Sequence, residues 1–316
     1  MLKKPSQIVV VSDGRPGHEN QSVGLAEALK RRVGVPWEKV SLQGLSFGKR
    51  IRILGEYLKT FDSPLVIGAG HRTHIPMAWQ RWRRKVPTVV IMRPSLPLRF
   101  FDVAVIPRHD GAIDDRGGRV WRTFGALNRI PETLPNKSIP GMILIGGPSR
   151  HHGWDEERLE QCLQDLLPDD QAEPWLVTNS RRTPAGFCEN RVLTEKSVEF
   201  FPHEQTGPGW LPEKLLQSRE VWVTEDSMSM IYEALTAGAR VGILPMPRLN
   251  KKARVIHSVE DLRREGRVVS FTDWQTNGFG SKANQPFHET GRIADAIVDR
   301  FFGNPEDRME LPVEMA

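Results

Sequence analysis

Residues 9–29 read VVVSDGRPGHENQSVGLAEAL, in which an apolar run is followed by a polar loop and then by a stretch with helical spacing. The apolar run is typical of a buried strand, and the final stretch is typical of an amphipathic helix. The loop, residues 12–21, contains two glycines and a proline, together with Asp13, Arg15, His18, Glu19 and Asn20. Because a helix cap needs only one polar side chain, five of them at a strand-to-helix turn indicate a functional site.

The same alternation of apolar strands and helical stretches continues along the chain. Apolar runs follow at 63–70, 87–94 and 102–108, and after the proline-rich segment 129–140 they return at 141–149, 174–181 and 220–224. Runs made almost entirely of Val, Ile and Leu predict parallel strands that helices cover on both faces. We therefore predict an α/β protein with two Rossmann-like, doubly wound domains facing a cleft. The expected domains are 1–135 and 136–288, with a C-terminal helix and tail, 289–316, packing back on the first domain.

Composition limits the class of protein. The chain has 316 residues, of which 39% are hydrophobic and 26% charged, enough for a core in each domain. No apolar run approaches the ~18 residues of a membrane span, and the N-terminus is interpreted as a first strand and not as a signal peptide. The two cysteines, Cys162 and Cys188, exclude a disulfide framework and a four-cysteine zinc site. We expect a cytoplasmic protein.

The basic residues are unevenly distributed. The formal net charge is +5, and residues 71–101 contain seven Arg or Lys residues and no acid: Arg72, Arg81, Arg83, Arg84, Lys85, Arg93 and Arg99. Such a block is typical of contact with nucleic acid, anionic lipid or a phosphorylated substrate. Trp79 and Trp82 lie among these arginines, and this favours an anionic membrane surface contacted by residues 79–85 over nucleic acid. The plainer alternative is a solvated helix face.

Ligands of open α/β sheets bind at the carboxyl ends of strands. This rule selects five stretches, 12–21, 68–74, 146–152, 178–182 and 224–229. In the second domain, a glycine-containing turn, an arginine and a carboxylate suit phosphate and ribose groups. The residues concerned are Gly146, Gly147, Ser149, Arg181, Glu225, Asp226 and Ser227. Each stretch has a plainer alternative. The glycines could form only a tight turn, Arg181 and Arg182 could be a surface pair, and Asp226 or Ser227 could be a helix cap.

In the first domain, Asp13, His18 or Glu19 could serve as a general base, and Arg15 could bind an acidic group. The chain contains no HExxH, no DxD and no GxSxG motif. The GAG at residues 68–70 lacks the third glycine of a dinucleotide fingerprint, because Thr73 takes its place. We expect neither a bound metal nor a nicotinamide cofactor.

Four segments together resemble one known family. They are SDGRPGHENQSVGLAEAL (12–29), GAGHRTHIP (68–76), MRPSLPLRFFDVAVIPRHD (92–110) and VTEDSMSMIYEAL (223–235). The chain is similar, over roughly residues 8–300, to the mitochondrial-fission family. That family includes the plant elongated-mitochondria proteins and bacterial homologues described as glycosyltransferases. The resemblance implies a GT-B arrangement in which the second domain holds most of the sugar nucleotide, and we expect a bacterial member.

With this resemblance, the sequence predicts a metal-independent glycosyltransferase that uses a nucleotide sugar as substrate and has no cofactor. Its acceptor would be an acidic glycan or a lipid-linked molecule at the inner face of the membrane. Asp13 or Glu19 is the expected base, with His18 next, and Arg15, His71 and Arg72 would orient the acceptor. Two alternatives stay open, namely a membrane-associated scaffold without catalysis and a sugar-nucleotide epimerase or hydrolase.

Overall fold

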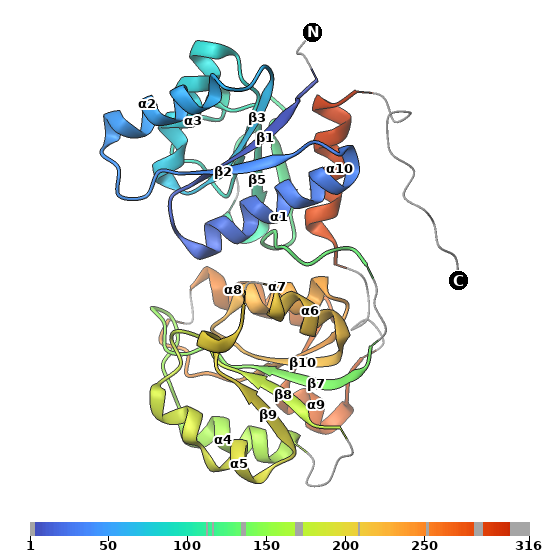
Figure 1. Ribbon diagram of the computed structural model, residues 1–316. Coiled ribbons are helices and arrows are strands. Elements are labelled where there is room, and N and C mark those ends of the chain that lie inside the picture. Colours follow the sequence, from blue (N-terminus) through green and yellow to red (C-terminus); the bar gives the residue numbers. More distant parts are fainter. Residues whose placement is uncertain are drawn as a thin grey trace. The chain divides into compact units, whose positions relative to one another are not determined.

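The computed structural model describes residues 4–303, except 112, 116, 134–136, 168–172, 208, 251–252 and 281–286. The chain divides into two compact units, unit 1 (Met1–Arg129 with His288–Ala316) and unit 2 (Ile130–Phe287). Each unit contains one six-stranded parallel sheet (Figure 1). The predicted boundary at residues 135 and 136 and the tail after residue 303 lie outside the described residues.

The sheet of unit 1 has the strand order β2-β1-β3-β4-β5-β6. Strands β1, β3, β4 and β5 are buried along their whole length because helices cover both faces, as their continuous Val, Ile and Leu runs predict. The strands are β1 (Gln7–Ser12), β2 (Trp37–Ser41), β3 (Pro64–Ala69), β4 (Thr88–Ile91), β5 (Val103–Pro107) and β6 (Val120–Thr123).

Two pairs of helices cover the two faces of this sheet. Alternate residues of β1 point to opposite faces, so Ile8 and Val10 pack with α1 and α10, whereas Val9 and Val11 pack with α2 and α3. The helices of the unit are α1 (Pro16–Val33), α2 (Phe47–Leu58), α3 (His71–Arg84) and α10 (Glu289–Phe301), with short 3₁₀ turns η1 (Leu98–Phe100) and η2 (Arg108–Asp110).

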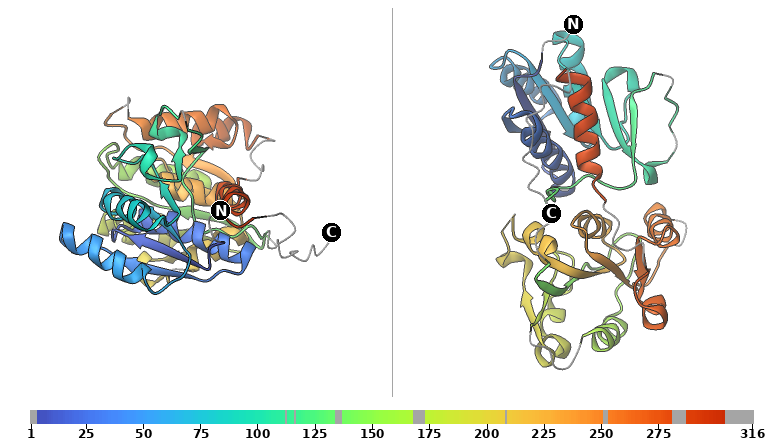
Figure 2. Two further views of the ribbon diagram at one scale, coloured as in Figure 1. Left: turned by 90° about the horizontal axis from the view of Figure 1, so that it is seen from above. Right: turned by 90° about the vertical axis from the view of Figure 1, so that its right-hand side faces the viewer.

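Helix α10 belongs to the core of unit 1 although it comes last in the chain. It lies beside α1 (Figure 2), and Ile297 is fully buried in the same cluster as Ile8. The Thr290 hydroxyl accepts from the amide of Asn128 at 3.0 Å and donates to its carbonyl at 3.1 Å. A Cβ on Gly24 of α1 would lie 2.2 Å from the Asn128 carbonyl oxygen, so the close approach of this segment requires glycine.

The sheet of unit 2 has the order β12-β11-β10-β7-β8-β9. Its largest fully buried side chain is Trp222, and a Cβ on Gly242 of the neighbouring strand would lie 2.4 Å from the indole ring. The strands are β7 (Ile139–Leu144), β8 (Trp175–Thr178), β9 (Val198–Phe201), β10 (Ser218–Thr224), β11 (Arg240–Leu244) and β12 (Val268–Ser270). The helices are α4 (Glu156–Leu166), α5 (Arg191–Glu195), α6 (Trp210–Gln217), α7 (Met228–Thr236), α8 (Arg254–Arg264) and α9 (Phe271–Asn277), with 3₁₀ turns η3 (Ala185–Glu189) and η4 (His203–Gln205).

Both sheets are doubly wound, which confirms the predicted fold class of two Rossmann-like units. In unit 1 the chain leaves β1 toward β2 and returns to β3 on the other side, so the strand order reverses between β1 and β3. In unit 2 the corresponding reversal lies between β7 and β10. The carboxyl ends of these strands are where open α/β sheets bind ligands. Within the described part of the chain, no helix is both long and apolar enough to cross a membrane.

We predict that Ile297→Ala lowers the free energy of unfolding of unit 1 by about 2–5 kcal/mol, because a buried isoleucine leaves a cavity that its neighbours fill only in part. Denaturant titration measures this change. Ile75→Ala is the matched control, since that isoleucine is exposed on α3. Equal stability of the two variants would contradict the placement of α10 in the core.

Candidate functional site

The polar loop after β1 is shorter than the sequence suggested. Helix α1 begins at Pro16, so His18 and Glu19 lie in its first turn and not in a loop. Proline suits this position because its fixed φ is helical and its missing N–H would have no partner in the first turn. The polar side chains are therefore held on a helix at the reversal point of unit 1.

Asp13 and His18 form the centre of this region. The Nδ1 atom of His18 lies 3.1 Å from Oδ1 and 3.0 Å from Oδ2 of Asp13, whose residue is only 4% exposed. With Nδ1 facing a carboxylate, the ring is assigned the tautomer that carries its proton there, which leaves Nε2 as the acceptor. The backbone N–H of Arg15 also donates to Asp13, at 3.1 Å, and fixes the carboxylate.

Gly70, between β3 and α3, makes this arrangement possible. Its φ is +91°, and a Cβ there would lie 2.4 Å from both Asp13 Oδ2 and His18 Nδ1. The junction after β3 therefore has to be glycine for the pair to approach it. Of the three candidate bases, Glu19 has different partners: it accepts from the Ser12 hydroxyl and from Lys39 Nζ at 3.3 Å.

Two more histidines complete what we call the unit-1 site (Asp13, His18, His71 and His74). The ring centroids of His71 and His74 are 5.5 Å apart, and His71 is exposed. His74 is buried, and its Nδ1 lies 2.9 Å from the Ser95 hydroxyl and accepts from the Ser95 amide at 3.2 Å. Its Nε2 has no hydrogen-bond partner among the described residues.

Burial lowers the pKa of His74 to about 4. Repulsion by His71 and His18 acts in the same direction, while Asp13 opposes it. The ring is therefore neutral at neutral pH. Arg15 and Arg72, the expected acceptor-binding arginines, are both exposed near this site at the starts of α1 and α3.

In unit 2, the loops after β7 and β10 interlock through two glycines. The amide of Gly146 donates to Thr224 Oγ1 at 2.7 Å, and the amide of Gly147 donates to Asp226 Oδ2 at 3.1 Å. A Cβ on Gly146 would lie 2.3 Å from Asp226 Oδ2, so the two loops could not meet if this residue carried a side chain. Both amides thus already have partners within the protein.

Asp226 is also paired with an arginine. Arg182 Nη2 lies 2.7 Å from Asp226 Oδ2, and Arg182 Nη1 donates to the Gly147 carbonyl at 3.0 Å. The buried carboxylate is therefore neutralised by a guanidinium that is partly open to solvent. The neighbouring Arg181 is exposed, and Ser149 uses its hydroxyl to accept the amides of His151 and His152 at 3.2 and 3.1 Å.

Helix α7 begins at the same edge of the sheet. Ser227 precedes it, but the Ser227 side chain makes no capping hydrogen bond. The first-turn amides of α7, residues 228–230, have no acceptor within the helix, and the helix dipole adds about half a positive charge there. We call the loops after β7 and β10, together with the start of α7, the unit-2 site. Within it, these amides, with Arg182 nearby, form the part that suits an anion.

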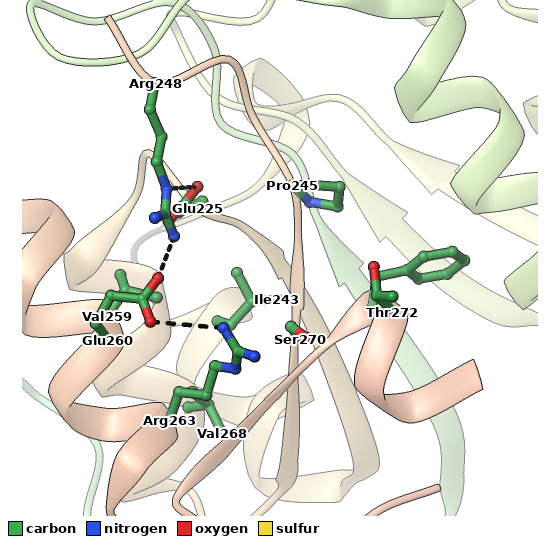
Figure 3. Close-up of a pocket in the computed structure, with 11 residues that line it drawn as sticks. Glu225, Ile243, Pro245, Arg248, Val259, Glu260, Arg263, Val268, Ser270 and Thr272 are labelled. Carbon is green, nitrogen blue, oxygen red and sulfur yellow. Dashed lines mark hydrogen bonds and ion pairs between the residues drawn. The ribbon is translucent and has the colours of Figure 1, made fainter. Parts of the chain in front are cut away.

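Glu225 belongs to a chain of charges beside this point (Figure 3). The residue is 3% exposed, and Arg248 Nε donates to its two oxygens at 2.8 and 3.1 Å. Arg248 also reaches Glu260 at 2.6 Å, and Glu260 is 3.5 Å from Arg263. These groups line a pocket of about 70 Å³ at the ends of β10, β11 and β12. Fully buried His152 lies 3.9 Å from Glu225, and its burial lowers its pKa.

The sequence did not point to Arg248 as a functional residue. Arg248 follows β11, so the same strand-end rule would have selected it if the loop after Leu244 had been included. His74 lies in the selected stretch 68–74, but local sequence did not show that its ring is buried and held by Ser95. Among the described residues, no group of three or more His, Cys, Asp or Glu side chains is arranged to hold a metal ion.

Comparisons with known proteins agree with this architecture. A model of the family described as Mitochondrial fission ELM1 matches residues 16–301. The uncharacterized protein RP120 of Rickettsia prowazekii (strain Madrid E) is 21% identical, with 92% of this chain and 97% of that protein covered.

Two solved structures share the fold. A structure assigned as a UDP-N-acetylglucosamine 2-epimerase from Listeria monocytogenes superposes with a TM-score of 0.61 at 10% identity, covering 94% of this chain and 97% of that one. The structure of the UDP-GlcNAc 2-epimerase from Neisseria meningitidis bound to UDP-GlcNAc gives a TM-score of 0.54 at 11% identity, covering 93% of this chain and 99% of that one. The fold is therefore that of the GT-B enzymes.

We predict that His74 makes stability depend on pH. Its pKa is about 4 in the folded protein, below the ordinary histidine value of 6.5, so the unfolded chain is protonated first as the pH falls. The contribution is present above pH 6.5 and is lost progressively down to pH 4, by a total of ~3 kcal/mol at about 1.36 kcal/mol per pKa unit.

His74→Gln should flatten the fall of the unfolding free energy across this range, as measured by urea titration at several pH values. His257→Gln is the control, because that histidine is exposed on α8 of unit 2 and is not among the groups that shift the pKa of His74. Parallel profiles for the wild type and His74→Gln would show that His74 titrates normally in the folded protein.

Proposed function

The chain belongs to the Mitochondrial fission ELM1 family, and from this premise we propose that it is a metal-independent enzyme that transfers a sugar from a nucleotide donor to a hydroxyl group. The observation that carries the proposal is the imidazole of His18, held by a buried carboxylate at the reversal point of unit 1. The shared fold with a UDP-GlcNAc 2-epimerase that binds UDP-GlcNAc supports a nucleotide sugar as the donor.

His18 is proposed as the general base. Its Nε2 would take the proton of the acceptor hydroxyl, whose oxygen would then form a bond to the anomeric carbon of the sugar. The bond from that carbon to the diphosphate would break, and the nucleoside diphosphate would leave with the bonding electrons. Asp13 would position the ring and stabilise the positive charge that it acquires.

This assignment separates residues that the sequence could not distinguish. Asp13 acts through His18, because both of its oxygens face the imidazole. Glu19 has a structural role instead, since it is held by Ser12 of β1 and Lys39 of β2. Arg15, His71 and Arg72 stay the candidates for binding an acidic acceptor, because all three are exposed beside the base.

The unit-2 site is proposed to hold the donor. The first-turn amides of α7 would bind the diphosphate, and the exposed Arg181 would add positive charge, while the charge of Arg182 compensates Asp226. Such fixed donors stabilise the negative charge of the leaving group, a task that a metal ion performs in other enzymes. Gly146, Gly147, Ser149, Asp226 and Ser227 would shape this turn, and Glu225 with Arg248 would meet the ribose hydroxyls at the small pocket.

A second candidate reaction is epimerisation or hydrolysis of the nucleotide sugar. The fold likeness to two UDP-GlcNAc 2-epimerase structures favours it. It differs from transfer in one measurable respect, because such an enzyme consumes its sugar nucleotide without any acceptor. A scaffold without catalysis would bind no nucleotide sugar in either unit.

We predict selective binding of one nucleoside diphosphate in calorimetric titrations, with equal affinity in magnesium and in a chelator. Ser229→Asp, at the exposed start of α7, should weaken this binding at least about tenfold, because the new carboxylate repels the diphosphate. Ser229→Asn introduces a side chain of the same size as aspartate but without its charge, so this variant should bind within about threefold of the wild type. Equal affinities for both variants would place the diphosphate elsewhere.

We predict that His18→Gln lowers turnover about 10²–10⁴-fold while donor affinity is unchanged. The assay measures release of nucleoside diphosphate, with a membrane lipid extract as the source of acceptor. Glu19→Gln is the control and should keep nearly full turnover. A loss of turnover in Glu19→Gln with activity retained in His18→Gln would reverse the assignment. Release of nucleoside diphosphate without the extract would favour hydrolysis, and conversion of the nucleotide sugar to an epimer without that release would favour epimerisation.

A further inference from the structure

Helix α3 carries an apolar stripe that faces away from the core. Ile75, Trp79 and Trp82 are spaced i, i+4 and i+7, a pattern by which a helix normally packs on a sheet, whereas Ala78 between them is buried and belongs to the core cluster that contains Met77. The sheet, however, is covered by another face of α3, which includes Met77. Ile75, Trp79 and Trp82 are 40%, 45% and 63% exposed.

This stripe forms one wall of an open groove of about 440 Å³. Leu96 and Phe100, from the segment after β4, form the other wall, and all the lining side chains are apolar. The rings of Trp79 and Trp82 are in contact, with centroids 5.2 Å apart. Helix α3 is also fixed to the segment that ends at Asp102, because Arg81 donates to both oxygens of Asp102, each at 2.9 Å.

Positive charge surrounds the groove. Arg83, Arg84 and Lys85 follow at the end of α3, Arg72 lies at its start, and Arg99 lies beside Phe100. Among the described residues, none of these five side chains has an acidic partner within salt-bridge distance, in contrast to Arg81. Residues 71–101 contain no acid at all. The surface therefore has strong charge complementarity to an anionic partner.

We propose that this groove and its cations, the α3 surface, dock on an anionic phospholipid bilayer. Tryptophan is enriched at the level of the headgroups, where an indole ring has apolar and polar neighbours. Arginine and lysine beside it bind lipid phosphates, and the attraction grows with each cation. A single-stranded nucleic acid would meet the same cations and could stack on the indole rings, but the aliphatic side chains of Ile75 and Leu96 in the same groove suit the apolar part of a bilayer interface better than they suit bases.

Docking would bring the unit-1 site close to the membrane. His71 and Trp79 lie on the same helix, and at 1.5 Å per residue they are about 12 Å apart along its axis. A bound bilayer would then present lipid headgroups near His71. This consequence, a lipid-linked acceptor, rests on the proposed function, whereas the docking itself does not.

The test is co-sedimentation of the full chain with vesicles in the absence of any nucleotide sugar, so that its outcome is independent of catalysis. Vesicles of phosphatidylcholine alone are compared with an equal mixture of phosphatidylcholine and phosphatidylglycerol. The wild type should bind the anionic vesicles at least about tenfold more tightly, with affinity falling as salt is added.

Two pairs of variants separate the apolar and the charged contributions. Trp79→Ser with Trp82→Ser should bind anionic vesicles at least about tenfold more weakly. Phe47→Ser with Leu249→Ser, two exposed apolar residues elsewhere, should bind like the wild type. The double variant Arg83→Gln with Arg84→Gln should bind anionic vesicles about 25-fold more weakly, which is about fivefold per cation removed. The double variant Lys30→Gln with Lys59→Gln should bind them like the wild type.

Unchanged thermal unfolding of each variant shows that a loss of binding is not a loss of folding. Equal binding to neutral and anionic vesicles, or unchanged binding by the double tryptophan variant, would overturn the proposal. The proposal would also be overturned if the protein bound single-stranded RNA through Trp79 and Trp82 but did not bind vesicles, because the partner would then be a nucleic acid.

Discussion

The reversal of strand order in each sheet is the constraint on which both candidate sites depend. In a parallel sheet all carboxyl ends lie at one edge, and the loops from two neighbouring strands separate only where the order reverses. In unit 1 these are the connections after β1 and β3, and His18 and His71 lie in the first turns of the helices α1 and α3 that follow. In unit 2 they are the loops after β7 and β10, which contribute Gly147 and Asp226.

The two sites handle buried charge in different ways, and the difference suits different chemistry. In unit 2, Asp226 and Glu225 each face an arginine, whose charge does not change at any ordinary pH. In unit 1, Asp13 faces an imidazole, whose second ring nitrogen is left as an acceptor. The first arrangement is suited to binding an anion in a fixed geometry, and the second is suited to moving a proton.

Much of the fold follows from local sequence pattern. The buried strands of both units appear as continuous Val, Ile and Leu runs, because helices cover both faces of each sheet, and the strand ends identify most of the polar loops. What local pattern does not contain is the choice of partner. His18 faces the carboxylate of Asp13 and not that of the neighbouring Glu19, because α1 begins at Pro16, which sets the direction of its first turn.

Long-range contacts were equally invisible. Glu225 is separated from Arg248 by a helix and a strand, so the sequence alone showed a carboxylate at a strand end without its guanidinium partner. Gly70 is a similar case. A Cβ at this position would collide with Asp13 and His18, and both of these residues come from the connection after β1. These features arise from the packing of separate strands, and only the assembled sheet determines them.

Helix α3 shows the limit of periodicity as a guide and also links the two proposals. Its sequence contains two apolar stripes, one with Met77 and one with Trp79, and spacing alone does not say which one packs on the sheet. The structure buries the first and leaves the second exposed on a helix that ends in Arg83, Arg84 and Lys85. A soluble enzyme gains nothing from an exposed tryptophan pair, because apolar area left in water forgoes about 25 cal/mol per Å² of stabilisation. The same helix begins at His71, beside the proposed base. If the exposed stripe docks on a membrane as proposed, the same helix would bring a lipid-linked acceptor to the proposed base.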